Sequence, residues 1–162
     1  MIALWDREGP RAARLVLGLG NPLMGDDGVG WRLVARLTAH PCLPRDVEVA
    51  WGGTDLLACG SRLRGRQWVV LVDAIESDGT DAPVVLDPLA GELEESAPGA
   101  HALSLSATLR LLRLERPELD EVPVRLFAVP VRRVSVGERL SPDLERRLPE
   151  ITSRLLREIA AG

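Results

Sequence analysis

The stretch that decides the fold is Arg14–Leu37, which reads RLVLGLGNPLMGDDGVGWRLVARL. Its first part, Arg14–Gly20, is a run of Leu and Val residues closed by glycines, which is typical of a strand buried on both faces. The segment Gly28–Ala39 then spaces four apolar residues so that they share one face of a helix, namely Val29, Leu33, Val34 and Leu37. A strand that leads into a helix through a glycine turn is the first half of a β–α–β unit.

The same pattern repeats along the next part of the chain. Val47–Trp51 is a predicted strand, Thr54 is a plausible N-cap for a helix that runs to Leu63, and Gln67–Asp73 is the most strand-like run of all. Strands that alternate with helices predict a parallel sheet with helices on both faces. Two further predicted strands complete the sheet, Ala82–Leu86 and Val122–Val129.

Two amphipathic helices are predicted in the second half, His101–Glu115 and Ser141–Ala160. Ser141 is the expected N-cap of the last helix, and Pro149 is expected to kink or divide it. Because no stretch resembles an interdomain linker, the sequence predicts a single α/β domain over residues 1–162, with residues 1–13 as a loose extension.

Composition excludes several classes of protein. The chain has 162 residues, with 20 basic and 24 acidic side chains and a net charge of −4. All the basic residues are arginines and they form no stripe, so we expect no nucleic-acid partner. No apolar run is long enough for a signal peptide or a membrane span, which favours a cytoplasmic protein without membrane insertion. Cys42 and Cys59 are too few for a disulfide scaffold, and we expect both in the core.

The candidate catalytic and metal-binding residues follow or end predicted strands. Asp26 and Asp27 follow the first strand, and Asp73 ends the third. Since ligands of open parallel sheets bind beyond the carboxyl ends of the strands, these carboxylates share one crevice if their strands are neighbours. Each also has an ordinary alternative, a helix cap for Asp26 or Asp27 and a turn former for Asp73. Carboxylates that face one another either raise a pKa or hold a cation.

His101 stands at the start of an amphipathic helix, where it is either a surface residue or a ligand. One imidazole with two or three carboxylates is a ligand set that suits zinc or nickel. Other motifs are missing or incomplete. The run Gly18–Leu23 has Leu23 where a dinucleotide loop needs its third glycine, so no nucleotide is expected, and the chain has neither a G-x-S-x-G elbow nor an H-E-x-x-H helix.

The run GLGNPLMGDDGVGWRLVARL, Gly18–Leu37, resembles the N-terminal signature of the hydrogenase maturation endopeptidases, which trim the C-terminal tail from the large subunit of nickel–iron hydrogenases. The resemblance continues over nearly the whole chain. Its further blocks are GGT at Gly52–Thr54, VVLVDA at Val69–Ala74, His101 ahead of an L-S-L helix, and GERLSPDLERRL at Gly137–Leu148.

The resemblance implies a fold and a site. The family fold is a three-layer α/β/α sandwich around a five-stranded, mostly parallel sheet with one antiparallel strand, for which Ala82–Leu86 is the candidate. The resemblance assigns nickel binding to three positions, Asp27, Asp73 and His101. We expect the nickel to arrive in a hydrogenase large-subunit precursor, with Asp27 or its neighbour Asp26 as general base. Substrate contacts are expected from the glycine-containing turn, Gly52, Gly53 and Thr54.

Two departures from the family pattern leave alternatives open. Many relatives carry an acidic residue before G-G-T, where this chain has Trp51, and some carry Gln where it has Val129. A non-catalytic factor that binds nickel or the large subunit is therefore one alternative. Peptidyl-tRNA hydrolases are another, since their opening strand resembles LVLGLGNP, but they need a histidine soon after the turn and the next one here is His40.

Overall fold

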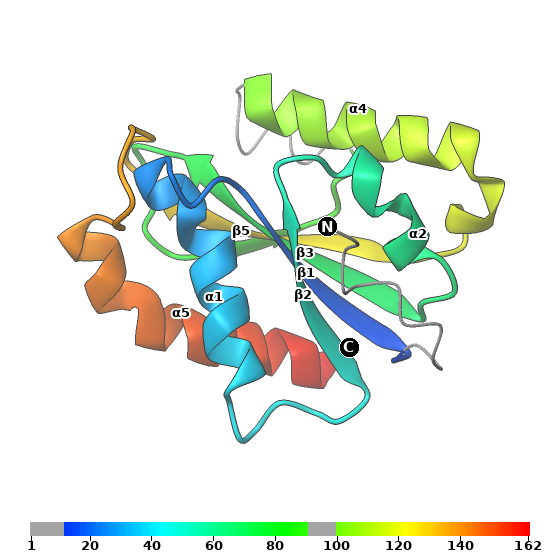
Figure 1. The fold of residues 1–162 in the computed structure, drawn as a ribbon, viewed down its shortest axis with the longest axis horizontal. Helices are drawn as coiled ribbons and strands as arrows, with labels where there is room; N and C mark the ends of the chain where they lie inside the picture. Colours follow the sequence, from blue (N-terminus) through cyan, green and yellow to red (C-terminus); the bar gives the residue numbers. More distant parts are fainter. Residues whose placement is uncertain (1–11, 91–99) are drawn as a thin grey trace, which may run out of the picture.

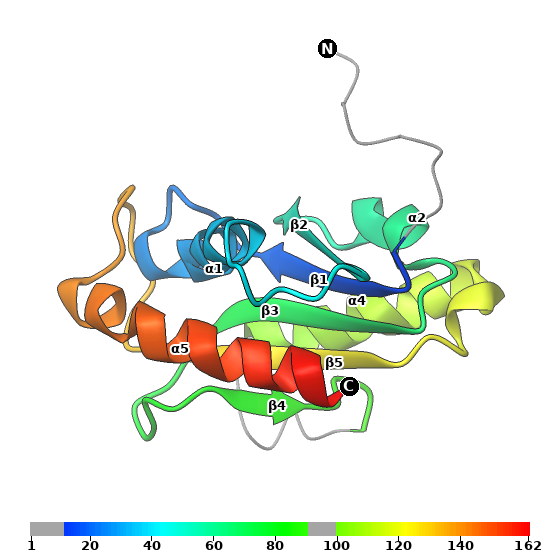
Figure 2. The same ribbon diagram turned by 90° about the horizontal axis from the view of Figure 1, so that it is seen from below.

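The computed structural model describes residues 12–90 and 100–162, and for residues 100–104 the backbone alone. The described residues contain one five-stranded sheet in the order β2-β1-β3-β5-β4 (Figures 1 and 2). All neighbouring strands are parallel except β4, which runs antiparallel to β5. The strands are β1 (Arg14–Leu19), β2 (Val47–Gly53), β3 (Trp68–Glu76), β4 (Val84–Leu86) and β5 (Val124–Val131). The expected α/β fold with one antiparallel strand is confirmed.

Helices cover both faces of the sheet. One face packs against α1 (Val29–Thr38) and α5 (Pro142–Ala161), and the other packs against α2 (Gly60–Leu63) and α4 (Ala100–Glu115). Figure 2 shows α5 in front of the sheet and α4 behind it. Three short 3₁₀ turns complete the elements: η1 (Gly25–Gly28), η2 (Leu57–Cys59) and η3 (Pro117–Leu119). The three layers agree with the predicted sandwich.

The alternation of side chains along the strands creates the two cores. In β3, Val69 and Leu71 face the α4 layer, whereas Val70 and Val72 face α1 and α5. Because both faces are covered, nearly every residue of β1, β3 and β5 is buried, and each fully buried Leu, Val or Phe side chain contributes about 1.5–3 kcal/mol. By the same alternation, position 73 of β3 belongs to the α4 face.

The helix expected from Thr54 to Leu63 is wrong in extent. The segment forms only η2 and the four-residue α2, and Asp55 rather than Thr54 caps it, since its Oδ1 accepts the backbone N–H groups of Leu57 and Ala58. Gly60 lies inside the segment, where a Cβ would stand 2.9 Å from a Leu112 side-chain carbon. The close approach of α4 thus requires glycine at position 60, and glycine has a low helix propensity, which agrees with the short helix observed here.

Three further predictions need correction. The third strand does not end at Asp73, because its parallel partner β5 continues and pairs with it up to Glu76. Pro149 does not divide the last helix: α5 is continuous from Pro142 to Ala161, and Pro149 lies within it as an exposed residue. Cys59 is buried as expected, but Cys42 is exposed in the turn after α1.

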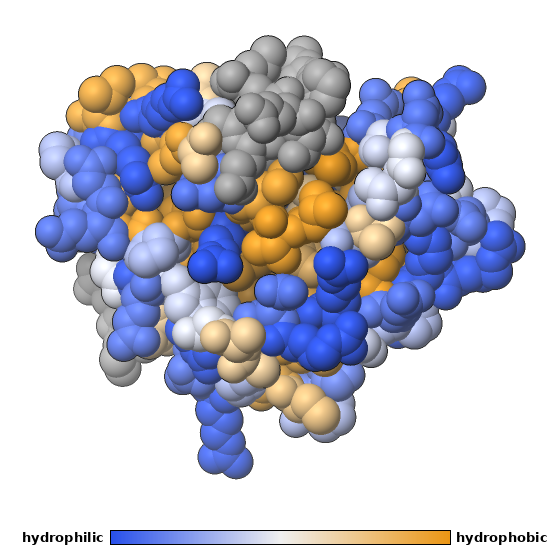
Figure 3. Space-filling view, turned by 180° about the vertical axis from the view of Figure 1, so that it is seen from behind, coloured by the Kyte–Doolittle hydropathy of each residue, from blue (hydrophilic) through white to orange (hydrophobic). Residues whose placement is uncertain are grey.

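The edge strand β4 is short: it has only three residues, and all of them are half-buried. Seen from the side opposite to that of Figure 1, the surface of the molecule shows an apolar area near its centre (Figure 3). Of the expected extension 1–13, residues 1–11 lie outside the described part, while the carbonyl of Ala13 accepts a hydrogen bond from the Gln67 N–H. In residues 12–90 and 100–162, no helix combines the length and hydropathy that crossing a bilayer requires.

Candidate active site

The two central strands separate at their carboxyl ends. β1 pairs with β3 only as far as Gly18 opposite Val72, so Asp73 is the first β3 residue beyond that ladder. The chain leaves β1 toward β2 on one side and later returns to β3 on the other. This is the topological switch point of the sheet, where open α/β folds bind their ligands.

Asp27 is held at this point by the backbone of the loop after β1. Gly20 has a φ of +108°, and a Cβ there would lie 2.0 Å from the carbonyl oxygen of Asp27. The Asn21 N–H donates to Oδ2 of Asp27 at 2.7 Å, and the Asp27 N–H donates to the Met24 carbonyl at 3.2 Å. The loop therefore requires glycine at position 20 and orients the Asp27 carboxylate through main-chain contacts.

Asp73 approaches the same place from inside the sheet. It is 3% exposed and lies on the α4 face of β3, in the row of apolar residues that contains Leu71 and Ile75. The Ala74 N–H donates to its Oδ1 at 2.9 Å. A carboxylate is unusual in an otherwise apolar row, and together with its place just beyond the β1–β3 ladder this makes Asp73 a candidate functional residue.

One cavity of about 230 Å³ brings the two carboxylates together. Asp27 and Asp73 line it with Gly53 and Thr54, while Gly52 does not reach it. Residues of β1, η2, α4 and the intervening loops complete the wall: Leu19, Gly20, Asp55, Leu56, Leu57, Leu105 and Thr108. Of the three turn residues predicted to contact substrate, two therefore line the cavity that holds the candidate carboxylates.

Gly52 packs closely against the core next to the turn at Gly53 and Thr54. A Cβ at Gly52 would meet Leu17 and Leu19 at 3.0 Å, and the Cys59 thiol donates to the Gly52 carbonyl at 3.4 Å. Burial raises the pKa of the Cys59 thiol, so it stays protonated and keeps its donor. Gly53 takes a φ of +72° and accepts the Gly20 N–H at 3.0 Å. The ends of β1 and β2 are thus joined at the mouth of the cavity.

His101 lies in the first turn of α4, and its side chain is outside the described residues. Two later positions of the same helix, Leu105 and Thr108, line the cavity. Among the side chains that the structure describes, no group of three or more His, Cys, Asp or Glu could hold a metal ion. The two carboxylates of the predicted set are together, and the third member is not described.

Asp26 points into a different environment from its neighbour. It is 7% exposed, and its two carboxylate oxygens accept the backbone N–H and the hydroxyl of Ser141 at 2.6 and 2.8 Å. Ser141 in turn caps α5, as the sequence predicted, by accepting the Leu144 N–H. Asp26 lines a second cavity with residues of the β5–α5 segment and is absent from the wall that holds Asp27 and Asp73.

Two residues of the wall were missed by the sequence interpretation. Asp55 follows directly after GGT, where the cap had been assigned to Thr54, and its carboxylate caps η2 instead. Thr108 lies seven residues after His101, so helical periodicity alone would have placed the two positions on one face. The apolar lining, including Leu57 and Leu105, carries no local sequence signal.

Comparison with known proteins assigns the family. The chain is 31% identical over 134 residues to the hydrogenase 2 maturation protease of Escherichia coli (strain K12), covering 80% of this chain and 76% of that protein. It is 28% identical over 152 residues to the hydrogenase expression/formation protein HupD of Thiocapsa roseopersicina, covering 90% and 67%. The chain belongs to the hydrogenase maturation protease family.

Solved structures agree with this assignment. The hydrogenase maturating endopeptidase HybD from E. coli superimposes with a TM-score of 0.73 at 26% identity, over 91% of this chain and 92% of that one. The maturation protease HybD from Thermococcus kodakarensis, at 23% identity and a TM-score of 0.72, shows the same fold. No family model matches the chain. The enzyme is therefore a peptidase, which favours the protease prediction over the non-catalytic and peptidyl-tRNA hydrolase alternatives.

The family departure at Trp51 lies at the rim of the site. Trp51 pairs with Gly18 in the sheet, is 43% exposed and does not line the cavity. Val129, the second departure, is fully buried in β5. Neither Trp51 nor Val129 lines the cavity that contains Asp27 and Asp73.

Proposed function

We propose that the enzyme removes the C-terminal tail of a hydrogenase large-subunit precursor and that nickel in the precursor is its recognition element. The observation that carries the proposal is the shared cavity of Asp27 and Asp73 beside Gly53 and Thr54, at the switch point of the sheet. Two carboxylates from separate strands supply oxygen ligands to a divalent ion. The family of the chain supplies the reaction, which is peptide-bond hydrolysis.

In this proposal His101 completes the ligand set. Positions 101, 105 and 108 are spaced so that they share one face of a helix, and the last two line the cavity. One nitrogen and two oxygen ligands can bind a nickel ion that keeps its remaining bonds to the precursor. A precursor without nickel would lose these bonds and would dock with its scissile bond in the wrong place.

The hydrolytic step needs a base, and Asp27 is our candidate. Its Oδ2 is held by the Asn21 N–H, so the carboxylate has a fixed orientation and a second oxygen to offer. A water molecule that adds to the scissile carbonyl carbon gives a proton to Asp27, and that proton then passes to the departing amide nitrogen. Asp26 acts as a positioning residue, because its bonds to Ser141 join η1 to α5.

The rim of the cavity suits a protein substrate. Four of the exposed large apolar side chains in the described structure lie at or after the carboxyl ends of strands: Leu23 (58%) after β1, Trp51 (43%) near the end of β2, Leu57 (40%) in η2 and Val136 (87%) after β5. Exposed apolar side chains near a polar site are typical of an interaction surface, and Trp is common among residues that dominate binding. Trp51 would then replace the family's acid as a docking contact.

The test is cleavage of a nickel-loaded precursor followed by mass spectrometry of its C-terminus. We expect Asp27→Asn and Asp73→Asn each to lower kcat/KM by about 100-fold or more, since each removes a charged ligand and the first also removes the base. The matched control is Asp46→Asn, which removes a carboxylate at the opposite end of the sheet and should leave cleavage unchanged. Wild-type rates in both site variants would contradict the assignment.

A second arm isolates the role of nickel. Wild-type enzyme is incubated with the same precursor purified without nickel. We expect no tail removal within the time that completes the reaction of the loaded precursor. Cleavage of both forms at one rate would disprove recognition through the metal while leaving the peptidase activity itself intact.

A further inference from the structure

A second cavity, of about 500 Å³, lies on the other side of η1. Asp26 lines it and Asp27 lines the first, and these are consecutive residues whose Cα atoms are about 3.8 Å apart. The two cavities therefore share the η1 backbone as a wall. A peptide chain bound in one needs only a few extended residues to reach the other.

Four arginines line this second cavity, and they are not equivalent. Arg132 pairs with Asp81 at 2.9 Å, and Arg147 donates to Asp143 at 3.4 Å. Arg133 and Arg139 are exposed and have no ion-pair or hydrogen-bond partner for their side chains among the described residues. In a chain of net charge −4, two guanidinium groups without a partner in one hollow are an anion site by their chemistry.

The carboxylates nearby do not neutralise these two arginines. Asp26 accepts both of its bonds from Ser141, and Asp81 and Asp143 are engaged by Arg132 and Arg147. The cavity is thus lined by three carboxylates, each with a partner, and by two arginines without one. Its electrostatic balance favours a ligand that brings negative charge.

The arginine-bearing segment is fixed to η1. The Gly25 N–H donates to the Gly137 carbonyl at 2.7 Å, and the Gly137 N–H donates to the Leu23 carbonyl at 2.9 Å. A Cβ at Gly25, where φ is +56°, would lie 3.0 Å from the Ser135 carbonyl oxygen. The loop between Arg133 and Arg139 therefore has a fixed position relative to η1, which carries Asp27.

We propose that Arg133 and Arg139 form a subsite that binds a carboxylate of the substrate's C-terminal tail. This deepens the proposed function and rests on it, because the tail is the part of the substrate that would extend from the Asp27 cavity across η1. A guanidinium fork matches a carboxylate in a planar, two-bond geometry. The carboxylate is either the α-carboxylate that ends the chain or an acidic side chain near that end.

The subsite is tested by binding, without any cleavage. The probe is a short synthetic peptide with two glutamates and a free C-terminus, titrated calorimetrically against the wild type, Arg133→Gln/Arg139→Gln and the control Arg110→Gln/Arg157→Gln. The control removes the same charge from exposed positions on α4 and α5. We expect the first variant to bind at least about tenfold more weakly than the wild type and the control to match the wild type.

Two modified peptides identify the source of the charge. Weaker binding of a C-terminally amidated peptide assigns the α-carboxylate, and weaker binding of a Glu→Gln peptide assigns the side chains; either result supports the subsite. Equal affinity of the two double variants, no binding by the wild type, or displacement by equimolar inorganic phosphate would overturn it.

Cleavage kinetics separate this inference from the function on which it rests. With a precursor that the wild type cleaves, Arg133→Gln/Arg139→Gln should raise KM about tenfold at nearly constant kcat. If no precursor were cleaved but peptide binding still depended on the two arginines, the subsite would stand and the proposed function would fail. Cleavage with an unchanged KM would remove the subsite alone.

Discussion

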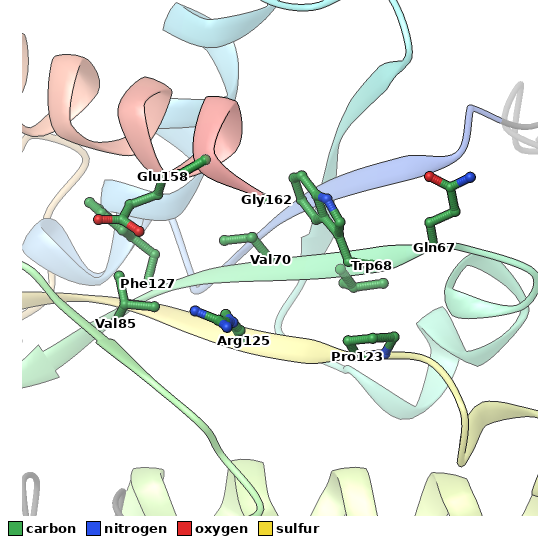
Figure 4. A pocket seen from close by; sticks show the side chains of 11 residues that line it. Gln67, Trp68, Val70, Val85, Pro123, Arg125, Phe127, Glu158 and Gly162 are labelled. Carbon is green, nitrogen blue, oxygen red and sulfur yellow. The ribbon is translucent and has the colours of Figure 1, made fainter.

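The two ends of the sheet carry cavities of similar size but different lining. The carboxyl-end cavity, about 230 Å³, contains Asp27 and Asp73, whereas the amino-end cavity, about 250 Å³, is lined mostly by apolar and aromatic side chains such as Trp68 and Phe127, with Arg125 and Glu158 among them (Figure 4). Size therefore does not distinguish a site from a gap in packing. What distinguishes them is that β1, β2 and β3 all direct their following loops to one end.

The polar groups at the amino end serve structure. Arg14 donates to both carboxylate oxygens of Asp46 at 2.8 Å, and its guanidinium carbon lies 5.4 Å from the centre of the Trp68 ring. The indole N–H of Trp68 is buried and has no hydrogen-bond partner in the described structure. At this end the Arg14–Asp46 ion pair links β1 to the segment before β2, whereas at the other end Asp27 and Asp73 line a cavity.

The largest expected effect comes from Gly20→Ala at the carboxyl end. The new Cβ would collide with the Asp27 carbonyl, and φ of +108° is strained for alanine. We expect a loss of about 2–4 kcal/mol in the free energy of unfolding and a fall in kcat/KM of about 100-fold, because the loop that carries Asp27, the proposed base, must move. Chemical denaturation and precursor cleavage measure the two effects.

The control for this variant is Gly79→Ala. Gly79 has open space around its Cβ position and no left-handed φ, so stability should change by less than about 0.5 kcal/mol. If Gly20→Ala behaved like the control in both assays, the loop after β1 would not be the element that positions Asp27, and the contrast between the two ends would lose its structural basis.

Local patterns predicted most of the fold and part of the site. The runs that became β1, β3 and β5, and the faces of α1 and α5, follow from periodicity because both cores depend on it. Asp27 and Asp73 were predicted to share one crevice if their strands are neighbours, and β1 and β3 do pair, so that both carboxylates line one cavity. The opposite directions of Asp26 and Asp27 could not be predicted, since they depend on contact with Ser141, which is 115 positions away in the sequence.

A smaller effect is expected from Trp68→Phe at the amino end. The substitution removes a buried donor that has no partner, which offsets part of the lost apolar contact, so stability should change by less than about 1 kcal/mol. The rate of precursor cleavage should not change, because Trp68 begins β3 and Asp73 follows it by five positions toward the other end. Reduced cleavage at unchanged stability would mean that the amino-end cavity takes part in function.

The smallest effect is a pH dependence confined to the Arg14–Asp46 pair. The hydrogen bonds from Arg14 lower the pKa of the Asp46 carboxyl below its ordinary value of 3.8. A lowered pKa in the folded state means that the stabilisation is present above the unfolded pKa and disappears as pH falls through the folded one. The difference in Tm between wild type and Asp46→Asn should thus be positive at neutral pH and vanish under acid conditions. A difference that grew as pH fell below 4 would show that Asp46 is not stabilised by Arg14, and that this end of the sheet relies on apolar packing alone.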